Sequence, residues 1–379
     1  MRDMRANLGV FRACVLAVVA LLCLQSGASA VPATPADGSH GFAAGAAYAA
    51  DQPWTAQGDP AIVQKVVHFD NGDVHLTGTL FMPAAGDHLA AVVVLHPAEQ
   101  PTRAYALYRH LTEGLPAMRM AVLVYDRRGS GQSSGNFASA GYEALADDAI
   151  AGAHAIAHEP RIDHSHIGYW GLSQGGWLSV VAAARDPKAA FAVSVSAPLV
   201  TASEQMHFAN RNELYLHGAP SADMAAATRA RDAWEGYLRG KGSRGEALAA
   251  LGAIENKPWF PLTFMPRPAD MGPPQASGYR LEMDQDPSLA VARVKAPMLF
   301  IFGGTDPWIP VALSVERLRR LAAARGDMEI RVIAGANHEM ELGTRETMAF
   351  DKTTMLTEAP NAPAYFTALA SWLARHAKP

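Results

Sequence analysis

The feature that most restricts the fold is the alternation of short apolar runs with helical segments. The runs are continuous rather than alternating, which is typical of strands buried on both faces of a parallel sheet. They are residues 89–95, 120–125, 167–170, 191–195, 298–302 and 330–333. The helical segments are residues 103–113, 142–158, 176–185, 311–324 and 364–376. This order indicates βαβ units with right-handed crossovers, and therefore an α/β fold.

An antiparallel edge and a long insertion complete the expected architecture. Residues 61–69 and 74–82 are β-rich, and they flank an Asn-Gly pair at 71–72, the strongest short signal for a hairpin. From 201 to 294 no strong strand is found, and this interval is too long for a loop. We expect a helical lid there, over the carboxyl edge of a mostly parallel sheet of about eight strands. The lid precedes the last two core strands.

The first thirty residues are expected to be a secretory signal peptide. Three arginines precede an apolar run from 13 to 24, and Ala28-Ser29-Ala30 supplies the small-residue cleavage pattern. The apolar run is shorter than a membrane-spanning helix requires. We therefore predict cleavage after Ala30, export to the periplasm or the medium, and a mature chain without a membrane anchor.

The chain divides into five parts on this basis. They are a signal peptide (1–30), a flexible leader (31–58), a first core part (59–200), the lid (201–294) and a second core part (295–379). Both cysteines lie within the signal peptide. The mature chain is therefore expected to have no disulfide, no thiolate metal ligand and no cysteine nucleophile.

Composition and charge restrict the partners. Hydrophobic residues make up 49% of the chain and charged residues 18%, which is typical of a globular protein with a sizeable core. The formal net charge is −4 and becomes −6 when residues 1–30 are removed. A negative chain does not attract nucleic acid or an anionic membrane surface, so neither is expected as a partner.

A serine lies in a turn that favours nucleophilic catalysis. Gly171-Leu172-Ser173-Gln174-Gly175-Gly176 follows a buried strand directly and precedes a helical segment, as G-x-S-x-G requires. A sharp turn with strained backbone angles leaves no room for side chains beside the serine, so glycine is expected on both flanks. The turn also places Ser173 near a helix amino terminus, where developing negative charge is stabilised.

A base and an acid follow in the order that this motif predicts. Asp306 comes directly after the strand at 298–302, and His338 comes after the strand at 330–333. A serine hydroxyl needs a base to remove its proton, and the imidazolium that results needs a carboxylate to orient it. We expect Ser173, His338 and Asp306 to meet at the carboxyl edge of the sheet in these roles.

These motifs resemble those of the α/β-hydrolase superfamily. From about Val63 onward the chain is similar to secreted serine esterases and to serine aminopeptidase-like hydrolases. Beside the serine turn, the resemblance lies in residues 92–97, in the Asp-x-Arg-Gly-x-Gly-x-Ser stretch at 126–133 and in residues 303–310. It implies the α/β-hydrolase fold, and it assigns no catalytic role to the 126–133 stretch, which is mostly scaffold in relatives.

The resemblance also implies an oxyanion hole made by the backbone amides of Gln174 and Ala98. Relatives have His-Gly in the loop after the third strand, whereas this chain has His96-Pro97. Proline has no amide hydrogen, but the donor of the family maps to Ala98, which keeps one. Loss of such a donor costs on the order of 10² to 10³ in rate, so the position of this loop decides catalytic efficiency.

Other candidate sites carry weaker signals. Gly129-Ser130-Gly131 lacks the third glycine of a dinucleotide site, and His154 and His158 have helical spacing without a His-Glu-x-x-His motif. We therefore expect no cofactor and no metal. Trp259 and Phe260, flanked by prolines, are candidates for an apolar substrate pocket, with packing in the core of the lid as the alternative.

The sequence predicts a serine hydrolase that cleaves carboxylic esters through an acyl-enzyme on Ser173. Two alternatives remain open. One is an exopeptidase or amidase on the same triad, with Glu99 or an acid of the lid holding the amino end of the substrate. The other is a binding protein that keeps the fold without catalysis. The expected partner is a small-molecule ester or amide, and no sequence feature indicates an oligomeric state.

Overall fold

The structure is a computed structural model that describes residues 62–98, 102–137, 140–323, 325–343 and 360–377. The expected signal peptide, the expected leader and Glu99 lie outside the described residues. Among the described helices, none combines the length and the apolar character needed to cross a membrane.

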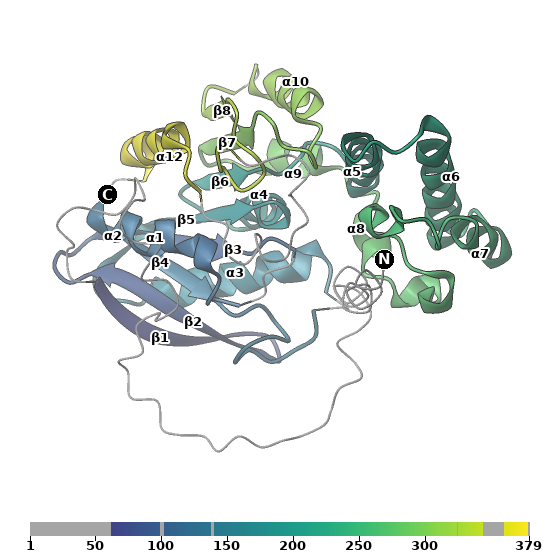
Figure 1. The fold of residues 1–379 in the computed structure, drawn as a ribbon. Coiled ribbons are helices and arrows are strands. Elements are labelled where there is room, and N and C mark those ends of the chain that lie inside the picture. Colours follow the sequence, from purple (N-terminus) through teal and green to yellow (C-terminus); the bar gives the residue numbers. More distant parts are fainter. Residues whose placement is uncertain (1–61, 99–101, 138–139, 324, 344–359, 378–379) are drawn as a thin grey trace, which may run out of the picture.

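One sheet of eight strands forms the centre of the molecule (Figure 1). The strands are β1 (Ile62–Asn71), β2 (Val74–Pro83), β3 (Leu89–Leu95), β4 (Met120–Tyr125), β5 (Ile162–Leu172), β6 (Ala192–Val195), β7 (Met298–Gly303) and β8 (Met328–Ile333). Their order in the sheet is β1-β2-β4-β3-β5-β6-β7-β8. The β1–β2 hairpin and the β2–β4 pair are antiparallel, and the other neighbours are parallel. The expected mostly parallel sheet is confirmed.

The continuous apolar runs result from burial on both faces of this sheet. Every residue of β3, β4, β6 and β7 is buried. Along β3, Ala91, Val93 and Leu95 face one apolar cluster, while Val92 and Val94 face the other. Successive residues of a strand point to opposite faces, so a strand covered on both sides must be apolar throughout.

Helices cover both faces of the sheet (Figure 1). One face is covered by α3 (Tyr142–Ile156), α4 (Gln174–Arg185) and α10 (Val311–Ala322), and the other by η2 (Ala106–Tyr108), α1 (Arg109–Thr112), α2 (Gly114–Ala117) and α12 (Pro363–His376). The helix expected at 103–113 is instead three short pieces that continue to Ala117. Pro116 has no amide hydrogen to continue a regular helix, which explains part of this difference.

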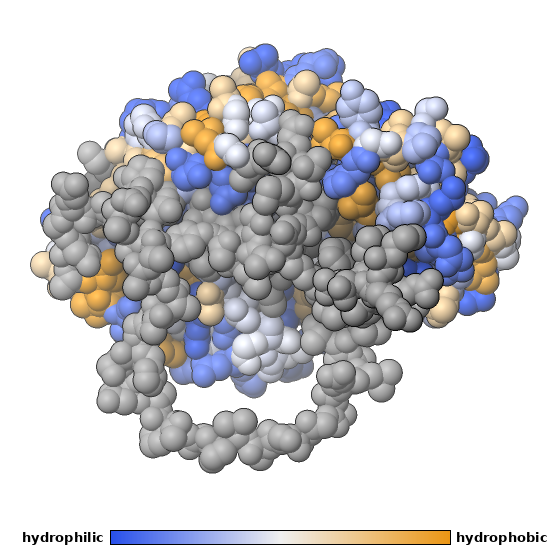
Figure 2. Space-filling model, in the orientation of Figure 1, coloured by the Kyte–Doolittle hydropathy of each residue, from blue (hydrophilic) through white to orange (hydrophobic). Residues whose placement is uncertain are grey.

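The segment from 201 to 294, called the insertion below, joins β6 to β7 and so precedes the last two strands. It contains α5 (Ala202–Leu216), α6 (Ser221–Leu238), α7 (Arg244–Gly252), η3 (Phe260–Thr263), η4 (Pro268–Asp270), η5 (Pro274–Ala276), α8 (Tyr279–Glu282) and α9 (Pro287–Arg293). Helices α5 to α8 project from one side of the sheet in Figure 1, and they enclose an apolar cluster separate from the two clusters of the sheet. On the face drawn in Figure 2, hydrophilic and hydrophobic residues are interspersed over this part of the molecule.

A buried histidine joins the carboxyl-terminal helix to α1. The Nδ1 of His110 donates to the carbonyl of Leu107, and its Nε2 accepts from the Tyr365 hydroxyl at 2.9 Å. Burial lowers the pKa of His110 from 6.5 to about 4. The folded state therefore holds a neutral imidazole over a range of pH in which the unfolded chain binds a proton.

We expect this histidine to make the protein less stable in acid. The stabilisation is complete above pH 6.5 and is lost as the pH falls towards 4, with a total of about 3 kcal/mol. The measurement is the free energy of unfolding of the wild type and of His110→Asn, which keeps a donor for Leu107, at several pH values between 7 and 4. Parallel curves for the two proteins would contradict the assignment.

Candidate active site

The serine turn is as tight as its glycines indicate. β5 ends at Leu172 and α4 begins at Gln174, so Ser173 alone makes the turn, with φ 57° and ψ −121°. This left-handed backbone is strained for any residue with a Cβ. A Cβ on Gly171 would lie 1.9 Å from the carbonyl oxygen of Gly175, which no packing adjustment could accommodate. The local sequence is therefore required by the geometry of the turn.

Asp306 and His338 form a buried hydrogen-bonded pair. Nδ1 of His338 lies 2.7 Å from Oδ2 of Asp306, and because an ionised carboxylate can only accept, Nδ1–H donates. In the neutral ring Nε2 is then the basic nitrogen. The other oxygen of Asp306 accepts the amides of Trp308 at 2.9 Å and Ile309 at 3.2 Å. Both carboxylate oxygens are therefore oriented by hydrogen bonds.

The sheet brings the three predicted residues to one edge. Ser173 follows β5, Asp306 follows β7 and His338 follows β8, and β5 to β8 are parallel neighbours whose carboxyl ends lie at that edge. Residues at the end of β6 form hydrogen bonds with both Ser173 and His338. The amide of Ser173 donates to the carbonyl of Val195 at 2.8 Å, and the hydroxyl of Ser196 donates to the carbonyl of His338 at 2.7 Å.

The loop that holds Ala98 touches the serine turn directly. A Cβ on Gly175 would lie 2.2 Å from the carbonyl oxygen of Leu95, so the backbones of the two segments are in contact. His96 is buried in this loop. Its Nε2 donates to the carbonyl of Tyr125 at 2.6 Å, and its Nδ1 accepts from the Tyr108 hydroxyl at 2.6 Å. Both ring nitrogens anchor the loop.

A buried arginine fixes the three residues of this loop. The guanidinium of Arg127 donates to the carbonyls of His96 and Pro97, each at 2.9 Å, and to that of Ala98 at 3.3 Å. It also lies 4.6 Å above the ring of Phe137. Sequence reasoning treated Arg127 as scaffold and missed this contact. The only signal was a charged residue two positions after a buried strand, because a bond to backbone carbonyls requires no particular partner residue.

Trp259 and Phe260 lie in the core of the insertion. They are 9% and 4% exposed and belong to its apolar cluster. The indole of Trp259 donates to Asp223 at 2.8 Å, and the guanidinium of Arg267 lies 5.4 Å from the ring of Phe260. This placement favours the core role over the pocket-lining role that the sequence suggested, because η3 folds both rings into the insertion.

Another aromatic pair lies beside the candidate base. The rings of Trp308 and His338 are 6.4 Å apart, and the ring of Phe264 lies 5.1 Å from that of Trp308. Trp308 belongs to the loop of Asp306, whereas Phe264 follows η3 of the insertion. No sequence pattern singled out Trp308. The tryptophan that faces His338 is therefore in contact with an aromatic side chain of the insertion.

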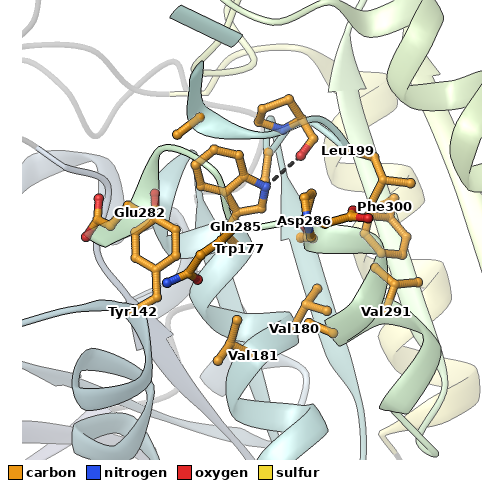
Figure 3. Close-up of a pocket in the computed structure, with 16 residues that line it drawn as sticks. Tyr142, Trp177, Val180, Val181, Leu199, Glu282, Gln285, Asp286, Val291 and Phe300 are labelled. Carbon is orange, nitrogen blue, oxygen red and sulfur yellow. Dashed lines mark hydrogen bonds between the residues drawn. The ribbon is translucent and has the colours of Figure 1, made fainter. Parts of the chain in front are cut away.

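A small apolar cavity lies beside the first turns of α4 (Figure 3). Its volume is about 60 Å³, and most of its lining residues are apolar, contributed by α4, α9, β7 and residues 197–202. The indole of Trp177 lines the cavity and donates to the carbonyl of Pro198 at 2.6 Å. Glu282, Gln285 and Asp286 contribute carboxyl and amide side chains, and Tyr142 and Ser194 contribute hydroxyl groups. A cavity of this size could accommodate a small apolar group.

Glu282 is a carboxyl group of the insertion near the serine turn. Burial raises the pKa of Glu282 to about 8, although a hydrogen bond from Tyr142 and the charge of Arg127 oppose the rise. Tyr142 also shares a hydrogen bond with the side chain of Gln174. Glu282 is therefore connected through Tyr142 to the residue that follows Ser173, and it is largely uncharged near pH 7.

The histidines with the spacing of metal ligands, His154 and His158, lie away from the serine turn. Within the part of the chain that the structure describes, no group of three or more His, Cys, Asp or Glu could hold a metal ion. His154 is 3.7 Å from Asp186. Together with His158 and His164 it lines a surface hollow of about 440 Å³. The hollow includes the start of β5, at the opposite end of that strand from Ser173.

Comparisons with known proteins agree with this architecture. Residues 108–232 match the model of the prolyl oligopeptidase family. An uncharacterized protein of Mycobacterium tuberculosis is 27% identical over 282 residues, which cover 74% of this chain and 73% of that protein. The α/β hydrolase GrgF from Penicillium has a TM-score of 0.52 at 18% identity, covering 83% of this chain and 99% of its own. A Pyrococcus furiosus esterase has a TM-score of 0.51 at 16% identity, covering 83% and 91%. The expected fold is confirmed.

The strained turn predicts an unusual order of stability. Replacing Ser173 by alanine retains a Cβ in a left-handed backbone, whereas glycine removes the strain. We expect Ser173→Gly to be about 1 kcal/mol more stable than Ser173→Ala, because the relief of strain exceeds the entropy cost of glycine. Urea denaturation of both variants measures the difference.

Ser165, near the start of the same strand, provides the matched control. Its backbone is not left-handed, so the Gly variant there should be less stable than the Ala variant by about 0.5 to 1 kcal/mol. The same order of stability at both positions would show that Ser173 is not strained.

Proposed function

We propose that the chain is a serine hydrolase of the α/β-hydrolase superfamily, and that it cleaves carboxylic esters through an acyl-enzyme on Ser173. The observation that carries the proposal is the buried Asp306–His338 pair at the sheet edge where the serine turn lies. We further propose that the protein acts after export, in the periplasm or the medium, on a small-molecule substrate. The insertion would serve as the lid of the site.

In the proposed reaction, His338, Asp306 and the oxyanion hole act once during acylation of Ser173 and once during hydrolysis of the acyl-enzyme. Nε2 of His338 accepts the proton of Ser173 while Oγ bonds to the carbonyl carbon, and Asp306 stabilises the imidazolium through Nδ1–H. The amides of Gln174 and Ala98 bind the oxyanion of the tetrahedral intermediate. The C–O bond to the alcohol then breaks, and His338 gives its proton to the leaving oxygen. Water repeats the sequence on the acyl-serine and releases the acid.

Apolar surroundings support an ester substrate. The ring of Trp308 lies beside His338 and packs against the ring of Phe264, and the cavity next to α4 is mostly apolar. Such walls bind alkyl or aryl groups by removing apolar surface from water. The buried guanidinium of Arg127 supports the oxyanion part of the proposal, because it fixes the loop in which proline replaces the usual glycine.

A second candidate is an exopeptidase or amidase on the same residues. The match of residues 108–232 to the prolyl oligopeptidase family favours it. Glu282 is an acid of the insertion near the serine turn, although a largely neutral carboxyl group would hold an ammonium group weakly. A non-catalytic binding protein is the third possibility, and a fluorophosphonate probe that fails to label Ser173 would favour it.

We expect Ser173→Ala to lower the hydrolysis of p-nitrophenyl acetate and butyrate by at least about 10³-fold. The variant loses the atom that forms the acyl-enzyme, so the fluorophosphonate label should be lost as well. Ser165→Ala is the matched control and should keep both activity and labelling. Full activity of Ser173→Ala in a protein that remains folded would refute the mechanism.

The ester and amide alternatives differ in a direct comparison. We expect the p-nitrophenyl ester of an N-acylated amino acid to be cleaved at least about 10²-fold faster, in kcat/KM, than the p-nitroanilide of the same acyl group. A free amino group on the substrate should not reverse this order. Preference for an anilide with a free amino end would instead support the exopeptidase.

A further inference from the structure

The loop of Asp306 determines where its carboxylate points. This acid loop comprises residues 306–309. Oδ1 of Asp306 accepts the amides of Trp308 and Ile309, while Oδ2 accepts from Nδ1 of His338. The carboxylate is a rigid group. If the peptide amides that donate to Oδ1 rotate, Oδ2 therefore moves away from the imidazole of His338. The orientation of the candidate base therefore depends on the conformation of the acid loop.

The insertion holds the same loop through one peptide group. The side-chain amide of Asn212, on α5, donates to the carbonyl of Pro307 at 2.8 Å. That carbonyl belongs to the peptide group whose N–H, on Trp308, donates to Oδ1 of Asp306 at 2.9 Å. A peptide group is planar, so its C=O and N–H turn together. Two hydrogen bonds on opposite sides of one peptide also polarise each other.

The insertion contacts the acid loop at a second point. The ring of Phe264 packs against that of Trp308 at 5.1 Å. Phe264 has a positive φ of 54°, and the carbonyl of the preceding Thr263 accepts from the buried guanidinium of Arg231 at 2.6 Å. Its position is therefore fixed from within the insertion. Two residues far apart in the insertion, on α5 and after η3, thus contact consecutive residues of the acid loop.

We propose that the insertion positions the carboxylate of Asp306, and that Asn212 orients this carboxylate through the Pro307–Trp308 peptide. Asn212 is a positioning residue, since it acts on His338 only through Asp306. The inference rests on the proposed function, because it assumes that Asp306 supports the base that activates Ser173. A hydrolase of this design reaches full activity only when the insertion is in contact with the acid loop.

The test removes the donor and retains the size of the side chain. We expect Asn212→Leu to lower kcat for p-nitrophenyl butyrate about tenfold, the effect of one hydrogen bond of ordinary strength, with KM changed less than about twofold. Asn212→Asp at pH 8, which also lacks the donor, should show a similar or larger loss. Gln205→Leu makes the same amide-to-alkyl change on α5 and should keep wild-type kcat.

A double-mutant cycle separates positioning from a general loss of structure. Asn212→Leu should lower the rate of fluorophosphonate labelling about tenfold in the wild-type background and less than about twofold in an Asp306→Asn background, because its effect runs through the carboxylate that is already absent. An undiminished tenfold effect in that background would overturn the proposal. A wild-type kcat in both folded Asn212 variants would also overturn it.

These outcomes are distinguishable from failure of the proposed function. Loss of labelling in Ser173→Ala together with wild-type kcat in Asn212→Leu would leave the hydrolase assignment intact and refute only the positioning role. Full labelling and activity of Ser173→Ala would refute both. If Asn212→Leu does not fold, Asn212→Asp decides the question alone, since its shape is nearly that of the wild-type side chain.

Discussion

Contact between backbone segments at the carboxyl edge of the sheet is the constraint on which the candidate site depends. A Cβ on Gly171, Gly175 or Gly303 would lie between 1.9 and 2.2 Å from a carbonyl oxygen of a neighbouring segment. Through these contacts the serine turn touches the Ala98 loop, and the end of β7, which leads into the acid loop, touches the loop of His338. No side chain separates the segments, so a shift in one displaces the next. Glycine is required here by space, and its conformational freedom matters less.

Polar side chains then hold the loops that this contact brings together. Arg127 donates to the loop of Ala98, Ser196 to the carbonyl of His338 and Asn212 to the acid loop. In each case the acceptor is a backbone carbonyl. A buried carbonyl without a partner destabilises the fold by about 1 to 3 kcal/mol. These bonds therefore stabilise the protein and also restrict the loops to one arrangement, in which Asp306 and His338 are already paired before any substrate is present.

The sequence was informative where a residue type is demanded by geometry or by burial. Continuous apolar runs predicted the strands, and strand ends predicted the positions of Ser173, Asp306 and His338. The sequence was uninformative about side chains whose hydrogen-bond partner is a backbone carbonyl. Neither Arg127 nor Asn212 could have been found from a pattern, because a carbonyl acceptor is present at every position of the chain. For Trp259 and Phe260, an aromatic pair between prolines looks the same in a core as in a pocket.

Helices α5 to α8 of the insertion have an apolar core of their own, and this separate core makes their contact with the acid loop important. A unit with a separate core can shift as a body without disrupting the packing of the sheet. The hydrogen bond from Asn212 then acts on the peptide group of Pro307, and the ring of Phe264 packs against the side chain of the next residue, Trp308. Substrate binding that brings the insertion into contact with the acid loop would favour the oriented carboxylate of Asp306. By linkage, an oriented Asp306 would favour the contact between the insertion and the acid loop. Substrate capture and activation of the base would therefore be two results of the same equilibrium.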